Sequence, residues 1–112
     1  WNLNLNRMYE RIRELTHEIF SAICGPLMGD KVLCVVMCDT QEDEYTTRLH
    51  MMEQAKELNR RLTTAVGQQF QIGIGSVVPV KELARSHKQA INALRQNKGE
   101  VCHFSDLPLQ KS

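Results

Sequence analysis

Phe70-Gln-Ile-Gly-Ile-Gly75 alternates apolar residues with glutamine or glycine, and this pattern predicts a short strand. Glycine weakens a strand, so two glycines on one face indicate close approach of another backbone, such as that of a packed helix. The following stretch, 81–97, has the helical pattern that predicts such a helix, and it ends at Lys98-Gly99. The residues that we expect on its inward side are Leu83, Ala84, His87, Ala90, Ile91 and Leu94. Glu100–Phe104 then predicts a last short strand.

A longer strand and a long helix are predicted upstream. Val32–Cys38 is continuously apolar and rich in β-branched residues, which favours an interior strand covered on both faces. The acidic run 39–44 ends this strand and suits the start of a helix. From Glu44 to about Val66 the apolar residues hold a helical stripe, which Gly67 closes. The stripe consists of Tyr45, Leu49, Met52, Ala55, Leu58, Leu62 and Ala65.

The first residues have two patterns in succession. Residues 1–5 alternate apolar and polar and suit the stub of a strand. An amphipathic helix then follows, with Asn6 as its N-cap and Gly25-Pro26 as its stop. Its apolar stripe consists of Leu5, Met8, Ile12, Leu15, Ile19 and Ile23. Two interpretations stay open: Met8, Ile12, Leu15 and Ile19 pack against the domain's own sheet, which we favour, or they form an interaction surface that makes a homodimer.

The elements alternate between helix and strand, which argues for an α/β sandwich with helices packed on a sheet. A length of 112 residues suits one domain spanning 1–112, with 105–112 as a linker to a further domain. The chain begins at Trp1 rather than Met, so we expect it to be part of a longer protein. A net charge of +1, with Lys and Arg interspersed among Glu, argues against a nucleic-acid surface. No apolar run is long enough to cross a bilayer, so we expect no membrane contact.

The chemistry-bearing residues form no recognised catalytic or metal-binding pattern. Cys34 and Cys38 lie roughly 13 Å apart along their strand, too far to bridge each other or to chelate one metal. The four cysteines are therefore interpreted as small core residues in a reduced, cytoplasmic setting. The histidines lack metal-ligand spacing, and Gly73-Ile-Gly75 lacks the further residues of a phosphate loop. We expect no catalytic residues, metal or cofactor.

Three stretches resemble one family: Phe70-Gln-Ile-Gly-Ile-Gly-Ser76, Leu83-Ala-Arg-Ser-His-Lys-Gln-Ala-Ile-Asn-Ala-Leu94 and Gly99-Glu-Val-Cys-His-Phe-Ser-Asp-Leu107. They are similar to the C-terminal part of GGDEF-like domains, in the degenerate form found in bacterial transcription regulators of the AraC and PucR types. The resemblance covers 70–107, and 28–107 by element order. It implies a nucleotidyl-cyclase-like α+β fold with a small, mainly antiparallel sheet. His87 stands where the family pattern has Tyr.

The resemblance also places a vestigial catalytic hairpin at Met28-Gly29-Asp30-Lys31-Val32. Active diguanylate cyclases have Gly-Gly-Asp-Glu-Phe there, and only Gly29 and Asp30 match. Lys31 replaces the Glu that contributes to metal and nucleotide handling, and a cation opposes Mg²⁺, which takes oxygen ligands. The Arg and Asp of the product-inhibition site have no counterparts in 17–27.

The expected function is therefore a non-catalytic signalling domain of a transcription regulator. It would relay an input to other domains of the same protein and reach DNA only through a separate domain. Two alternatives stay open: a small-effector or nucleotide sensor that uses the vestigial cleft, and an incomplete diguanylate cyclase completed by upstream sequence.

Overall fold

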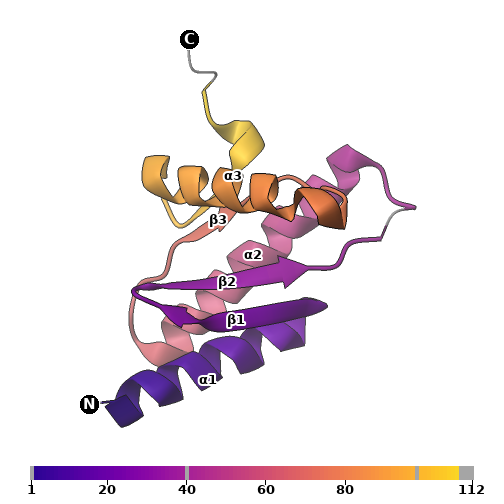
Figure 1. Cartoon of the computed structure of the whole chain (residues 1–112). Helices are drawn as coiled ribbons and strands as arrows, with labels where there is room; N and C mark the ends of the chain where they lie inside the picture. The colour runs from indigo at the N-terminus through magenta and orange to yellow at the C-terminus, as the bar shows by residue number, and fades with distance from the viewer. Residues whose placement is uncertain (1, 40, 98, 109–112) are drawn as a thin grey trace. The chain divides into compact units, whose positions relative to one another are not determined.

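The computed structural model describes residues 2–39, 41–97 and 99–108. In order along the chain, its elements are α1 (Asn2–Ile19), β1 (Ala22–Met28), β2 (Lys31–Val36), α2 (Glu44–Val66), β3 (Ile72–Ile74), the 3₁₀ turn η1 (Val80–Glu82), α3 (Leu83–Gln96), β4 (Val101–His103) and the 3₁₀ turn η2 (Phe104–Asp106). Figure 1 shows this α+β architecture, which confirms the predicted fold class. The chain divides into two units, 1–69 and 70–112.

In the first unit, β1 and β2 form an antiparallel hairpin. The ladder is irregular between Cys24 and Leu27, where one strand bulges. Pro26 lies within this irregular stretch, and a bulge tolerates a residue that has no N–H to donate. The hydroxyl of Tyr9 on α1 donates a hydrogen bond of 2.8 Å to the carbonyl oxygen of Gly25, so the bulge is fastened to the helix.

The core of the first unit lies where α1 packs against α2 and the hairpin. Its buried apolar side chains are Ile12, Leu15, Phe20, Ala55, Leu58 and Leu62. Thr16 is buried among them, and its hydroxyl donates a hydrogen bond of 2.7 Å to the carbonyl oxygen of Ile12. This bond satisfies the hydroxyl inside the helix.

Helix α2 begins and ends where the sequence predicts. Asp43 is its N-cap, and the Asp43 side chain accepts hydrogen bonds from the backbone N–H (2.8 Å) and the hydroxyl (2.9 Å) of Thr46. Gly67 ends the helix with a φ of 78°, in the left-handed region that glycine adopts without a steric penalty. Ala55, Leu58 and Leu62 of the predicted stripe are buried, but Tyr45 and Leu49 are exposed.

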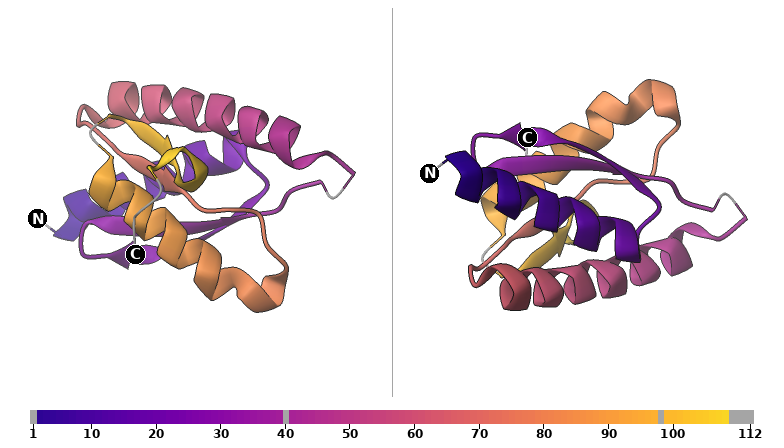
Figure 2. Two further views of the ribbon diagram at one scale, coloured as in Figure 1. Left: turned by 90° about the horizontal axis from the view of Figure 1, so that it is seen from above. Right: turned by 90° about the horizontal axis from the view of Figure 1, so that it is seen from below.

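In the second unit, β3 and β4 form a parallel pair joined through α3 (Figure 2). A parallel pair needs such a crossover connection. A Cβ built on Gly73 would lie 2.4 Å from the carbonyl oxygen of Ala90, and one on Gly75 only 2.0 Å from that of Ser86. The predicted close approach of a helix to the glycine face is thus confirmed.

Three predictions about the bounds of the first helix are wrong. The predicted strand stub at 1–5 is helical from Asn2, and Asn6 lies inside α1 instead of capping it. Leu5 and Met8 are both half-buried, and their three-residue spacing continues the helical stripe toward the N-terminus, which outweighs the short alternation. The predicted stop at Gly25-Pro26 lies inside β1.

The apolar residues of the hairpin are less covered than predicted. Ile23, assigned to the helical stripe, lies in β1 and is 63% exposed. The strand predicted at Val32–Cys38 is confirmed as β2, but Leu33 is 43% exposed, so the prediction of cover on both faces is wrong.

In the second unit, the predicted helix and both short strands are confirmed, and Ala90, Ile91 and Leu94 of the predicted inward face are half-buried, but the first part of that face is not covered. Leu83, Ala84 and His87 are exposed, whereas Ala93 is fully buried. Of the predicted linker 105–112, residues 105–108 are described and 109–112 lie outside the described residues.

Candidate functional site

The tip of the β1–β2 hairpin carries the residues that the sequence singled out. Met28 and Lys31 are paired, so Gly29 and Asp30 form a two-residue turn. Gly29 has a φ of 64° and Asp30 has no positive φ, which matches the preference of such turns for glycine at the first central position. The hairpin predicted to correspond to the catalytic motif is therefore present as a tight, exposed turn.

Within this turn, the Lys31 ammonium lies 2.9 Å from a carboxylate oxygen of Asp30. A hydrogen bond from Lys31 and its positive charge lower the pKa of Asp30. The Asp30 side chain is 89% exposed and that of Lys31 is 54% exposed, so solvent screens the pair. The Asp30 carboxylate, which is the group that could bind a cation, is thus already paired with the Lys31 ammonium.

The hairpin residues do not fit a Mg²⁺ site. Such a site is built from carboxylates, backbone oxygens and phosphates around the cation. Over the described residues, no group of three or more His, Cys, Asp or Glu side chains is arranged to hold a metal ion. Gly29 supplies no side chain and Lys31 supplies a cation, so Asp30 is left as the single carboxylate of the turn.

A second place with concave geometry lies in the first unit, where α1 and β2 end near the first half of α2. This hollow has a volume of about 520 Å³ and is open to solvent. The residues that line it are Ile19, Phe20, Ser21, Val36, Met37, Cys38, Asp39, Glu42, Thr47, His50, Met51, Glu53 and Gln54. The sequence did not predict it, because the acidic run was interpreted only as a helix start.

Several polar groups of this hollow are already engaged with one another. His50 Nδ1 lies 3.0 Å from a carboxylate oxygen of Glu42. Gln54 donates a hydrogen bond of 3.3 Å to the carbonyl oxygen of Ile19. Burial, followed by the nearby charge of Glu42, raises the pKa of the Cys38 thiol. The hollow therefore combines an apolar wall with an imidazole–carboxylate pair, a lining suited to a small polar ligand.

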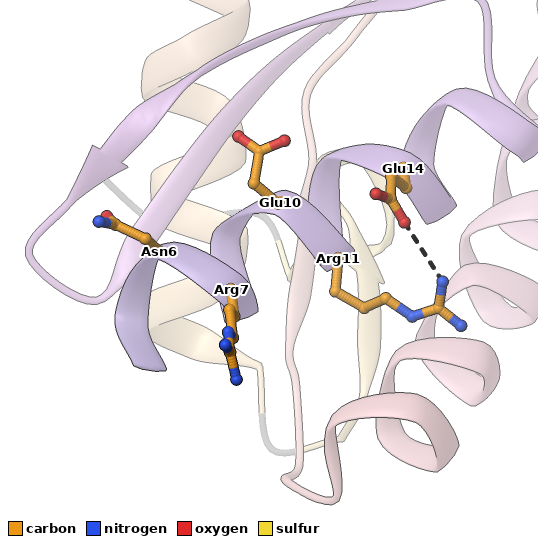
Figure 3. A pocket seen from close by; sticks show the side chains of 5 residues that line it. All are labelled: Asn6, Arg7, Glu10, Arg11 and Glu14. Carbon is orange, nitrogen blue, oxygen red and sulfur yellow. Dashed lines mark hydrogen bonds and ion pairs between the residues drawn. The ribbon is translucent and has the colours of Figure 1, made fainter. Parts of the chain in front are cut away.

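Figure 3 shows a third concave surface, of about 300 Å³, along α1. The side chains of Asn6, Arg7, Glu10, Arg11 and Glu14 line it, and Arg11 pairs with Glu14 at 3.3 Å. All five residues are exposed and come from the same helix. Mixed charges at this spacing are typical of a solvated helix face.

The predicted interaction stripe lies on the covered face of α1, not on its solvated face. Ile12 and Leu15 are buried, and Met8 and Ile19 are half-buried. Since α1 contacts both α2 and β1, the chain itself covers these residues. This burial favours the packing interpretation of the stripe.

The described helices include none that combines the length and apolarity needed to span a membrane. A protein-family model described as a GGDEF-like domain matches residues 3–96, which extend from α1 to the end of α3. No curated protein and no solved structure matches the chain.

Proposed function

Because this chain belongs to the GGDEF-like domain family, we propose that it is a non-catalytic signalling domain of a bacterial transcription regulator of the AraC or PucR type. In this role it passes an input to a separate DNA-binding domain of the same protein. The observation that carries the proposal is the Asp30–Lys31 pair at the hairpin tip. In the family's active members this hairpin presents a Glu at the position of Lys31, and here an ammonium neutralises the one matching carboxylate.

The charge at the tip supports the absence of nucleotide turnover. Phosphoryl chemistry with two metal ions needs several oxygen ligands that hold the cations and the substrate phosphates together. At this tip Gly29 contributes no side chain, and Asp30 is paired with Lys31. A cation could bind at Asp30 only after it displaced the Lys31 ammonium, whose positive charge repels it.

The catalytic part of the proposal is tested on the full-length protein with GTP and Mg²⁺, with an active diguanylate cyclase as the positive control. We expect no nucleotide product from the protein under conditions in which the control reaction is complete. Product above the blank would contradict the proposal and favour the incomplete-cyclase alternative.

The regulatory part is tested in cells with a reporter gene under the regulator's control. Asp30→Ala and Lys31→Ala each remove one partner of an exposed pair, so we expect an unchanged reporter response from both. Loss of the response in Asp30→Ala alone would show that the carboxylate is used and would contradict a vestigial hairpin. A full-length chain without a DNA-binding region would contradict the regulator assignment.

A second candidate function is a sensor of a small effector, which the hollow of about 520 Å³ in the first unit favours. Its His50–Glu42 pair would recognise a ligand that carries both hydrogen-bond donors and acceptors. Calorimetric titration with guanine nucleotides and cyclic dinucleotides tests this candidate. Heat that disappears in His50→Ala, with Arg60→Ala outside the hollow as the control, would support it. Absence of heat with every compound would count against it.

A further inference from the structure

Two of the four cysteines face each other across the β1–β2 hairpin. Cys24 and Cys34 are directly opposite in the antiparallel register, and their sulfur atoms are 3.4 Å apart. Both are free thiols and both are half-buried, so neither lies in the closed core. The sequence did not predict this pair, because β1 was interpreted as the end of a helix.

The backbone geometry of this pair suits a disulfide. Opposite residues in an antiparallel ladder have Cα atoms about 4.5–5.5 Å apart. A disulfide needs a Cα separation of about 4.4–6.8 Å, so the strands already hold the two residues within range. Bond formation requires the sulfur atoms to approach by only about 1.4 Å, to roughly 2.05 Å.

The other two cysteines provide a contrast within the same chain. The thiol of Cys38 lies 4.0 Å from the carbonyl oxygen of Val36, and that of Cys102 lies 3.6 Å from the carbonyl oxygen of His103. In both contacts the neighbour of the thiol is a backbone oxygen and not a second sulfur. Cys38 and Cys102 therefore serve as internal controls.

We propose that Cys24 and Cys34 form a reversible dithiol–disulfide site that closes across the hairpin, with a low-molecular-weight disulfide such as glutathione disulfide as its oxidant. In the first step the thiolate of one cysteine attacks a sulfur of the small disulfide. A mixed disulfide forms and one small thiolate leaves. The thiolate of the second cysteine then attacks the protein sulfur of that mixed disulfide. The Cys24–Cys34 bond forms and the second small thiolate leaves.

The exchange is balanced. Two electrons pass from the two protein thiols to the small disulfide, and the two protons end on the two small thiols released. The proposal goes beyond the signalling role and does not depend on it. It assigns a modification site to the strands that lead to the Gly29–Lys31 turn.

Closure would fix the hairpin at its most irregular point. The bond would tie the register at Cys24, next to the bulge that begins there and ends at Leu27. The closed ring would contain residues 25–33, including the Asp30–Lys31 tip. In the reduced hairpin the backbone ladder joins the two strands at Cys24, and the Tyr9 hydroxyl holds the neighbouring Gly25 to α1. Oxidation would add a covalent link between the strands and so further restrict the movement of the bulge and the tip.

The environment of Cys34 keeps the reduced form long-lived at neutral pH. Burial, followed by the hydrogen bond with Cys24, raises the pKa of the Cys34 thiol to about 12. The thiolate is the attacking species, so a raised pKa slows exchange. We therefore expect oxidation to accelerate as the pH rises, by up to about tenfold per pH unit while the thiolate fraction is small.

The test is to incubate the native protein in buffers with increasing ratios of oxidised to reduced glutathione. The reaction is stopped with acid, the remaining thiols are alkylated in denaturant, and the products are read by mass spectrometry. We expect the main oxidised species to lose two of its four thiols without a glutathione adduct. Peptide mapping should then find a Cys24–Cys34 link that dithiothreitol reverses.

Two variants make the result specific. The double variant Cys38→Ser with Cys102→Ser should oxidise with the same midpoint ratio as the natural chain and should lose both remaining thiols. Cys24→Ser should form no intramolecular link and should stop at a mixed disulfide or remain reduced. Circular dichroism verifies that both variants are folded.

The proposal is overturned if the natural chain keeps four thiols at every glutathione ratio, or if it accumulates only glutathione adducts. A link that involves Cys38 or Cys102, or one between two chains, would equally overturn it. None of these outcomes bears on nucleotide turnover or reporter response, so failure here is distinguishable from failure of the signalling role.

Discussion

The Tyr9 hydroxyl donates a hydrogen bond of 2.8 Å to the carbonyl oxygen of Gly25. This contact joins the middle of α1 to the part of β1 where the ladder is irregular. At a bulge some backbone groups lose their partners in the neighbouring strand, so a side chain from another element can satisfy them.

Tyr9→Phe removes the hydroxyl and keeps the ring. The carbonyl of Gly25 then loses a partly buried partner, so we expect the free energy of unfolding to fall by about 0.5–1.5 kcal/mol. Urea denaturation monitored by circular dichroism measures the change. Tyr45→Phe is the matched control, because Tyr45 is 63% exposed, and it should leave stability nearly unchanged. Equal effects in the two variants would show that the bond contributes nothing specific.

Gly75→Ala places a methyl group 2.0 Å from the carbonyl oxygen of Ser86. Because that oxygen belongs to the backbone of α3, the helix would have to shift, and we expect a destabilisation of about 1–3 kcal/mol. Gly99→Ala is the control, since the nearest atom to its new Cβ is 3.5 Å away. Thermal unfolding measures the melting temperature of both variants. We expect it to be lower than that of the natural chain in Gly75→Ala alone.

Leu15→Ala tests whether the stripe of α1 packs within its own chain. Leu15 is only 5% exposed, so truncation should leave a cavity and cost about 2–4 kcal/mol. Leu49→Ala, at a residue that is 42% exposed, should cost much less. Light scattering of Ile12→Glu complements this measurement. A folded variant whose mass falls relative to the natural chain would support dimerisation through the stripe instead.

Asp43→Asn tests the charged N-cap of α2. Hydrogen bonds from the backbone N–H and then the hydroxyl of Thr46 lower the pKa of Asp43 below its unfolded value. The carboxylate therefore contributes stability above the unfolded pKa, and this contribution is lost as the pH falls through the folded pKa. Asn keeps an acceptor for the cap without the charge, so we expect a smaller loss of stability between about pH 6 and pH 3. Identical pH profiles would contradict the prediction.

The long elements of this fold could be predicted from the sequence because local signals specify them. Asp43 and Gly67 bound α2 through capping chemistry that involves only neighbouring residues. Gly73 in β3 and Gly75 just after it likewise predicted the close approach of α3. The inward face of α3 was predicted correctly at Ala90 and Leu94 but wrongly at its first turn, because the phase of the helix depends on contacts with the β3 segment. Gly73 and Gly75 meet Ser86, Ala90 and Leu94, which places His87 one position away, on the exposed side.

Strand β1 was missed for a related reason. Gly25-Pro26 resembles a helix stop, and only pairing with β2 shows it to be a bulge. A signal was nevertheless present, since Gly29-Asp30 between two apolar runs is typical of a hairpin. The hairpin tip could therefore be placed by resemblance, whereas the Cys24–Cys34 pair and the hollow beside His50 depend on contacts between distant segments.

Gly73 and Gly75 also have a mechanical consequence. With no side chains between them, the backbones of β3 and α3 touch directly, and there is no compressible layer to absorb a displacement. The strand exit is fastened to the helix as well, since the Ser86 hydroxyl donates to the Ser76 carbonyl oxygen and Gln89 accepts from the Ser76 N–H. A displacement of α3 would therefore be passed to β3 by direct backbone contact, and through the paired strand β4 to the chain that continues at Phe104.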